Sequence, residues 1–330
     1  MKNYTSYELV IKPMSSFLTS MQSDIIFGHI IWAASELDGE DKASDILNQV
    51  RQKNPPFIIS NGFPEGMLPK INNIKNSKVF QEVSKHHDMT SKTEKIKLMK
   101  FMKKQKKKAF VTKKEFEILR TSPITTTFTM DTEQAEEHTS HAVSQYNVKN
   151  TINRLDSSTV FTDSSGREFS GLYGMTETFY KGNLSTYIKL RNDYDKDELV
   201  KYLKYIELTG YGKKKSSGKG RFEIISFEPA TWIDREINNP NGYITLSNYV
   251  PEKNDYTQII FADISTKRGK LSGGYATEEN IFKKSIVHYL PGAVFESDNP
   301  GEIKGKALDN IHFREEILQF MIPFTVEVKL

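Results

Sequence analysis

Residues 209–222 read TGYGKKKSSGKGRF and combine glycines with basic residues without a single acid. Glycine adopts positive φ angles freely and lets a backbone approach a ligand closely. Lysine and arginine neutralise phosphate, and serine hydroxyls donate to its oxygens. A solvated basic surface turn is the alternative, but glycines flank the cations on both sides, which favours binding of an anion such as an RNA or DNA backbone. The candidate ligand-binding residues are Lys213, Lys214, Lys215, Ser216, Ser217, Gly218, Lys219 and Arg221.

Two familiar phosphate-binding motifs do not fit this stretch. A P-loop has four residues between its first glycine and its Gly-Lys-Ser/Thr, whereas five separate Gly212 from Gly218, and Gly220 stands where the hydroxyl belongs. In the dinucleotide motif Gly-x-Gly-x-x-Gly, Lys215 would occupy the third glycine position. A nucleotide cofactor is therefore poorly supported, and we expect no cofactor and no bound metal.

Composition indicates an ordinary globular protein with an uneven charge. The 330 residues are enough for two domains. The chain has no cysteine and no apolar run of about 18 residues, so we expect a cytoplasmic protein without signal peptide or membrane span. Residues 95–114 hold ten lysines and no acid, so the net charge of +4 becomes 4 − 10 = −6 without them. This run is either a patch for an anionic partner or a self-repelling insertion; as an insertion, its deletion should leave folding intact.

Hydrophobic patterns predict strands and helices in a recognisable order. We expect strand 7–12, a helix from an N-cap at Ser23 to Gly39, a short helix 45–52, strand 57–60, a polar insertion at about 70–120, strand 123–130, a hairpin across 169–190 with its turn at 181–183, helix 195–208 and strand 221–227. With an insertion, this order matches a βαββαβ ferredoxin-like domain. The predicted fold is therefore α+β with two ferredoxin-like, RRM-like units, a first at 1–230 and a smaller, β-rich second at 231–330.

Two further places carry candidate functional residues. Asn153 and Arg154 lie in a polar stretch whose amides and guanidinium suit contacts to a nucleic-acid backbone or base edges. The alternative is a capped turn with an exposed arginine. His29 lies beside the apolar side of the first predicted helix, where it either packs or acts as a general acid–base.

Five blocks of this sequence resemble one protein family. The glycine stretch 210–222 resembles the signature loop of the RAMP superfamily of CRISPR systems. The other blocks resemble one branch of it, the crRNA 5′-end capping subunits (subunit four) of type III-A Csm effector complexes. They are SFLTSMQSDIIFGHIIWAASELDG (16–39), PPFIISNGFPEGMLPK (55–70), NTINRLDSST (150–159) and PGAVFE (291–296). The resemblance spans most of the chain in scattered blocks.

The resemblance implies a non-catalytic RNA-binding scaffold in a ribonucleoprotein complex of antiviral defence. Such a subunit holds the 5′ repeat-derived tag of the crRNA, contacts the large polymerase-like subunit and abuts the backbone RAMP subunit, with no membrane involved. Residues 213–219 and Arg221 match the RNA-contacting loop, and Asn153 and Arg154 match a segment expected near the tag. Two alternatives stay open, a metal-independent CRISPR RNA-processing endonuclease that uses His29, and a stand-alone RNA-binding module.

Overall fold

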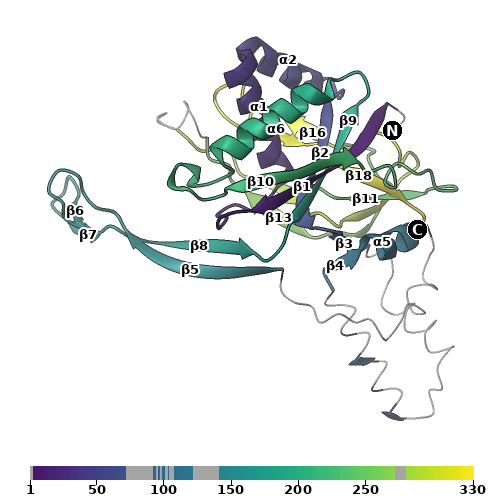
Figure 1. Ribbon diagram of the computed structural model, residues 1–330, viewed down its shortest axis with the longest axis horizontal. Coiled ribbons are helices and arrows are strands. Elements are labelled where there is room, and N and C mark those ends of the chain that lie inside the picture. Colours follow the sequence, from purple (N-terminus) through teal and green to yellow (C-terminus); the bar gives the residue numbers. More distant parts are fainter. Residues whose placement is uncertain are drawn as a thin grey trace.

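The computed structural model describes residues 3–71, 108–121, 141–271 and 280–330, with isolated positions between 92 and 103. It is a mixed α/β structure with several antiparallel sheets and few helices (Figure 1). The predicted strand 123–130 and most of the lysine run lie outside the described residues. No helix in the described part combines the length and apolar character needed to cross a membrane.

The N-terminal half is built around a four-stranded antiparallel sheet. Its strands are β1 (Tyr4–Pro13), β2 (Phe57–Pro64), β9 (Leu184–Arg191) and β10 (Phe222–Pro229), in the order β10-β1-β9-β2. Helix α1 (Ser23–Asp38) and the short α2 (Glu40–Arg51) lie between β1 and β2, and α6 (Lys196–Thr209) lies between β9 and β10. The connections therefore follow the predicted βαββαβ order, with a long excursion between β2 and β9.

The predicted helices form, with small corrections at their starts. Helix α1 begins at Ser23 itself, and the residue in the N-cap position is Gln22, whose side chain makes no capping bond. Its apolar side chains Phe27 and Ile30 are buried as the helical spacing predicted. Helix α6 starts after Asp195, whose carboxylate accepts a hydrogen bond from the amide of Asp197 at 2.9 Å.

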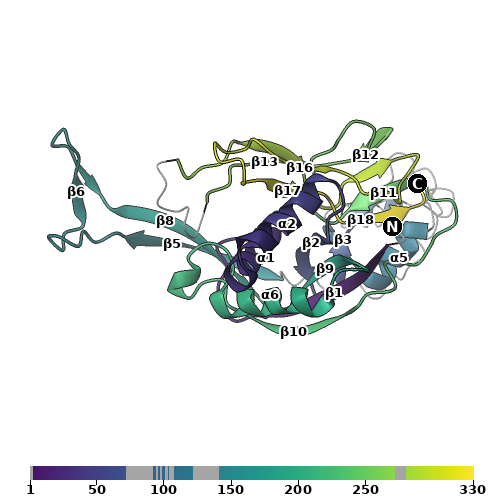
Figure 2. The same cartoon turned by 90° about the horizontal axis from the view of Figure 1, so that it is seen from above.

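The predicted hairpin across residues 169–190 is wrong. Strand β8 (Leu172–Tyr180) and β9 are joined by the expected turn, but β9 pairs with β1 and β2 and has no free edge for β8. Strand β8 pairs instead with β5 (Ala142–Asn150) over its whole length. Together with the short β6 (Val160–Thr162) and β7 (Glu168–Ser170), these strands form a long ribbon, called the arm here, which extends away from the body (Figures 1 and 2).

The C-terminal half is made of short strands. A second antiparallel sheet has the order β12-β15-β11-β18, and two strand pairs, β13–β14 and β16–β17, accompany it. The strands are β11 (Gly242–Thr245), β12 (Gln258–Phe261), β13 (Ile264–Lys267), β14 (Ile286–Tyr289), β15 (Val294–Glu296), β16 (Lys306–Leu308), β17 (Gln319–Met321) and β18 (Thr325–Val328). Within the described residues after 230 there is no helix, so a second ferredoxin-like unit is not confirmed.

One hydrophobic core runs through both halves of the chain. Phe27 of α1 stacks on Phe320 of β17 with ring centroids 4.2 Å apart. The ring of Tyr187 on β9 meets that of Trp232 edge-on, with centroids 5.9 Å apart, and lies tilted against Phe324 at 6.4 Å. The core therefore fixes the N-terminal sheet, α1 and the C-terminal strands to one another, while the predicted division at residue 230 stays a prediction.

The end of the predicted insertion belongs to this core. Strand β3 (Met67–Pro69) pairs with β4 (Phe110–Thr112), and α5 (Lys113–Thr121) follows directly. Val111, Phe116 and Leu119 are buried in the main core cluster. The expectation that residues 70–120 are all peripheral is thus wrong at this end, because apolar residues there recur at helical spacing. Deleting residues 95–114 would remove β4, so it should destabilise the fold.

Phe116 offers a direct test of this packing. Its ring is fully buried and meets the indole of Trp232 edge-on at 6.2 Å. Phe116→Ala should lower the free energy of unfolding by about 3–5 kcal/mol because it leaves a cavity. Urea unfolding measures the change, and Lys114→Ala on the exposed side of α5 is the control, with an expected effect within about 0.5 kcal/mol. Equal midpoints for both variants would contradict a core role for α5.

Candidate nucleic-acid interface

The glycine loop, residues 210–221, has a closed neck. The amide of Tyr211 donates to the carbonyl of Gly220 at 3.0 Å, and the amide of Gly220 donates to the carbonyl of Ser16 at 2.9 Å. Gly220 has a φ of +66°, and a Cβ there would lie 1.9 Å from the Tyr211 carbonyl oxygen. Glycine at this position is therefore required both by the backbone angle and by the close approach of the two chain segments.

The neck is anchored to the segment that leads into α1. The Tyr211 ring is buried, and its hydroxyl donates to the Ser20 carbonyl at 2.9 Å and accepts from the Gln22 amide at 3.1 Å. The Lys213 amide donates to Thr19 Oγ1 at 3.2 Å. The backbone amides on both sides of the loop are thus largely used within the protein, and the contacts to a ligand fall mainly on the side chains.

The loop tip displays its basic and hydroxyl side chains outward. A 3-10 turn, η2 (Lys215–Ser217), follows Lys214, which adopts a left-handed conformation with φ of 61°. Lys215 is half-buried, and burial lowers the pKa of its ammonium group. The exposed candidate residues are Lys213, Lys214, Ser216, Ser217, Gly218 and Arg221, and no ion pair holds these three cations to a described residue.

Lys219 has a different environment from the other predicted cations. Its Nζ lies 2.5 Å from Oε2 of Glu177 and 2.9 Å from Oγ of Ser16. Ser16 Oγ also donates to Glu177 Oε2 at 2.7 Å. The bonds from Lys219 and Ser16 lower the pKa of Glu177 to about 2, so this buried carboxylate is charged at neutral pH. The predicted phosphate ligand Lys219 is therefore ion-paired within the protein, to a partner that local sequence reasoning missed.

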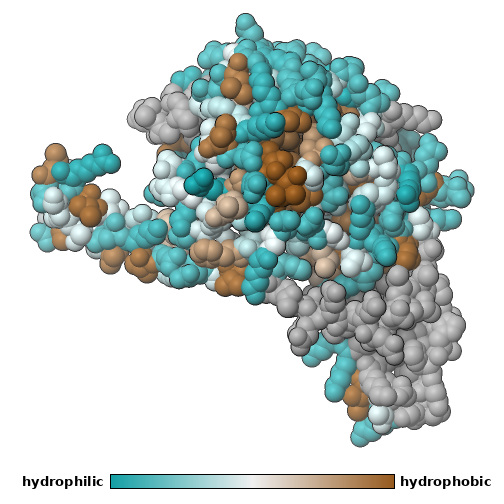
Figure 3. All heavy atoms as spheres, in the orientation of Figure 1, coloured by the Kyte–Doolittle hydropathy of each residue, from teal (hydrophilic) through white to brown (hydrophobic). Residues whose placement is uncertain are grey.

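The arm borders the glycine loop. The backbones of Phe17 and Thr178 exchange two hydrogen bonds of 2.8 Å, which join the arm to the segment after β1. Lys214 Nζ lies 5.6 Å from the centroid of the Tyr173 ring on β8, within cation–π range. Apolar side chains, brown in Figure 3, gather along the arm and at its outer end. The most exposed are Tyr146, Val148, Ile152, Leu155 and Leu172.

The structure does not bring Asn153 and Arg154 to the glycine loop. They lie in the segment between β5 and β6 at the outer end of the arm (Figure 1). The side-chain oxygen of Asn153 accepts from the amide of Leu155 at 3.0 Å, and its backbone bonds twice with residues 157 and 158. Asn153 thus shapes a turn, while Arg154 is exposed. An RNA contact at these residues stays a prediction.

His29 supports the loop through its imidazole. Its Nε2 accepts a hydrogen bond from the amide of Gly212 at 3.0 Å, and its ring lies 5.1 Å from that of Tyr211. Burial and then the positive charge of Lys215 lower the pKa of His29 from 6.5 to about 4, so the ring is neutral at pH 7. The Nε2 lone pair is occupied by the amide, which favours a structural role over that of a general base.

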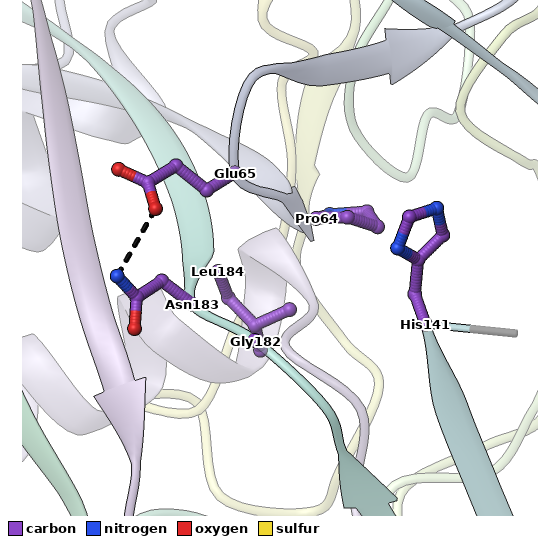
Figure 4. Close-up of a pocket in the computed structure, with 6 residues that line it drawn as sticks. All are labelled: Pro64, Glu65, His141, Gly182, Asn183 and Leu184. Carbon is purple, nitrogen blue, oxygen red and sulfur yellow. Dashed lines mark hydrogen bonds between the residues drawn. The ribbon is translucent and has the colours of Figure 1, made fainter. Parts of the chain in front are cut away.

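The small pocket in Figure 4 has no convergent reactive groups. It has a volume of about 190 Å³ and is lined by Pro64, Glu65, His141, Gly182, Asn183 and Leu184. The Glu65 carboxylate accepts from the Asn183 amide at 3.0 Å, on the side away from the His141 ring. Within the described residues, no group of three or more acidic or histidine side chains is placed to hold a metal ion. The glycine loop is therefore the stronger candidate site.

Comparisons with known proteins agree with the family resemblance. No protein-family model matches the chain. Over 147 residues it is 28% identical to "CRISPR system Cms protein Csm4" of Streptococcus thermophilus, which covers 43% of this chain and 48% of that protein. The chain thus aligns with about half the length of this curated relative.

Solved structures extend the likeness to nearly the whole chain. A chain in the crystal structure of a Csm3–Csm4 subcomplex of the type III-A CRISPR–Cas interference complex has a TM-score of 0.58, at 16% identity and coverage of 98% of this chain and 100% of that one. A chain in a Csm1–Csm4 cassette with pppApA has a TM-score of 0.55, at 15% identity and 98% coverage of each. The predicted resemblance to Csm4 is thereby confirmed, and at these identities the solved structures show a shared fold.

The two glycines after η2 make a matched pair for testing the neck. Gly218 and Gly220 both have positive φ, but a Cβ at Gly218 meets no atom within 4 Å. Gly218→Ala should lower the free energy of unfolding by about 1 kcal/mol, from backbone strain alone. Gly220→Ala adds a clash with Tyr211 and should lower it by at least about 3 kcal/mol or displace the loop. Thermal unfolding distinguishes them, and equal effects would contradict the closed neck.

The depressed pKa of His29 predicts a pH dependence with a defined sign. Between pH 6.5 and about 4 the unfolded chain binds a proton at His29 that the folded chain does not, so folding stability falls as the pH falls through this window. His29→Gln keeps an acceptor for Gly212 and does not titrate. From about pH 7 to about pH 5 the wild type should lose up to about 2 kcal/mol more than this variant. Urea unfolding at both pH values measures this, and parallel losses would count against a neutral, half-buried His29.

Proposed function

We propose that this chain is a non-catalytic RNA-binding scaffold subunit of a type III-A CRISPR effector complex. In this role its glycine loop grips the backbone of the 5′ repeat-derived tag of the crRNA. The observation that carries the proposal is the construction of the loop. A closed neck holds it to the body, and it presents Lys213, Lys214 and the hydroxyls of Ser216 and Ser217 at the surface, with the exposed Arg221 directly beside the neck.

The chemistry of the tip suits a polyanion. Three exposed cations lie within nine residues and can each neutralise a phosphate, and serine hydroxyls donate to phosphate oxygens. Tyr173 on the neighbouring arm adds an aromatic face on which a base can stack, and Lys149 lies on the same strand pair. Groups of this kind bind a strand through its backbone and bases without reading a long sequence, as expected for the constant tag of a guide RNA.

The likeness to Csm4 supports the proposed partners. Solved relatives of the same fold occur in a Csm1–Csm4 cassette and a Csm3–Csm4 subcomplex. We therefore assign this chain the large polymerase-like subunit, Csm1, and the backbone RAMP subunit, Csm3, as protein partners. We keep the assignment of ferredoxin-like RAMP units at 1–230 and 231–330 as part of this proposal, and the strand order of the N-terminal sheet supports the first of them.

A scaffold role agrees better with the site than the endonuclease alternative does. Acid–base cleavage of RNA requires a side chain that is free to transfer a proton at the reacting phosphate. The Nε2 of His29 accepts the Gly212 amide, and the ring is held between Tyr211 and the loop backbone. We therefore assign His29 to the support of the loop and propose that RNA is held rather than cut.

A salt titration tests the function. Replacing Lys213, Lys214 and Arg221 together by alanine should weaken binding of single-stranded RNA that carries a 5′ repeat-derived tag. It should also flatten the slope of log K against log salt by about 2, because three phosphate contacts are lost. The full chain, with and without the large subunit, is titrated by fluorescence anisotropy across a salt series.

The control variant removes the same charge elsewhere. Lys253, Lys284 and Lys329 are exposed and distant in the sequence from the loop, so their replacement by alanine should leave the slope nearly unchanged. Equal slopes for the two triple variants would refute the loop as the RNA site. Recovery of shortened RNA after the titration would favour the endonuclease alternative instead.

A further inference from the structure

We infer that Glu177 is a positioning residue that locks the arm to the glycine loop and withholds Lys219 from nucleic acid. This inference rests on the proposed function for its RNA consequence, whereas its mechanical part concerns the protein alone. Glu177 is the one charged side chain of the arm that is buried. Glu177 is 2% exposed although it lies on β8, where most neighbouring side chains are open to solvent.

Three separate segments meet at Glu177. Ser16, from the segment after β1, donates to its carboxylate, and Lys219, from the glycine loop, forms the ion pair. Lys149 of β5 lies 3.6 Å from its second oxygen and belongs to the arm itself. The same Ser16 accepts the Gly220 amide with its carbonyl, so one residue joins the neck of the loop and the root of the arm.

The bonds of Glu177 are part of the attachment of the arm to the body. The Phe17–Thr178 backbone pair and the bonds of Glu177 to Ser16 and Lys219 join the root of the arm to the body. On the paired strands, Glu177 and Tyr173 lie on one face because side chains alternate along a strand. The Glu177–Lys219 ion pair therefore holds this face of the arm toward the loop. The same face carries the Tyr173 ring, over which Lys214 lies.

The Lys219–Glu177 ion pair also changes the charge that a bound nucleic-acid strand would meet at the loop. Lys219 donates to a carboxylate and contacts a hydroxyl oxygen, so its charge is compensated where it stands. A phosphate at the loop then meets Lys213, Lys214 and Arg221, which are exposed. Removing the charge of Glu177 would free Lys219 as an additional cation beside the same loop.

Hydrogen–deuterium exchange of the full chain without RNA tests the mechanical part. Glu177→Gln keeps the size of the side chain but removes its charge, and the amides of Phe17, Thr178 and Gly220 should then exchange about tenfold faster or more. Glu168→Gln removes one negative charge from the exposed outer end of the arm and is the matched control. The buried strand β9 reports that the body remains folded. Root amides that exchange at the wild-type rate in Glu177→Gln would overturn the inference.

Salt titration with tagged single-stranded RNA tests the charge part. Glu177→Gln should steepen the slope of log K against log salt by about 0.7, because the freed Lys219 gains a phosphate contact. The double variant Glu177→Gln/Lys219→Met should restore the wild-type slope. A flatter slope in the double variant than in the wild type would show that Lys219 already contacts RNA and would refute its withholding. Failure of the wild type to bind RNA would refute the proposed function, while the exchange result would still decide the mechanical part.

Discussion

The close approach of Gly220 to Tyr211 is the constraint on which the candidate interface depends. No side chain fits at residue 220, because the opposing carbonyl oxygen occupies the space of a Cβ. The neck therefore closes, and the Tyr211 side chain is buried beneath it. Its hydroxyl bonds the backbone of Ser20 and Gln22, just before α1. From this closed base the left-handed Lys214 and the 3-10 turn follow, and they direct the basic tip outward. In this molecule Gly220 is required by the backbone conformation of the loop and by its contact with Tyr211, rather than by the approach of a ligand.

The neck has a firm support because both halves of the chain share one core. Asp24, at the start of α1, is buried and bonds Lys267 of β13, Asn248 and Gln319 of the C-terminal half. At the other end of the body, the buried guanidinium of Arg120 donates to the carbonyls of Trp232, Arg235 and Glu327. Buried charges of this kind are stable only with several partners. They fix the relation of α1, α5 and the C-terminal strands, and thereby the segment that anchors the loop.

Sequence patterns predicted the elements whose signals are local. The apolar spacing of α1 and α6 and the apolar run of β2 each lie within a few residues, and these elements form as expected. The partner of β8 could not be predicted this way, because the choice between β9 and β5 depends on β1 and β2 occupying both edges of β9. At the site, the cation cluster was visible, but the pairing of Lys219 with Glu177 spans 42 positions and required the fold. Tyr146 and Val148 follow the alternation of a strand in β5, but the polar residues around them obscured this signal.

In the proposed function, the loop would select its ligand through its shape rather than through its total charge. Of its five cations, Lys219 is neutralised by Glu177 and Lys215 is half-buried with a lowered pKa, which leaves three at the surface. A loop with five free cations would bind any polyanion more tightly, since each phosphate contact adds to the salt-dependent affinity. Because Lys219 is paired with Glu177, it would contribute less to that unselective attraction and instead helps to hold the loop against the arm. A strand held at the loop would then meet Tyr173 in a defined orientation, which a mobile basic turn could not provide.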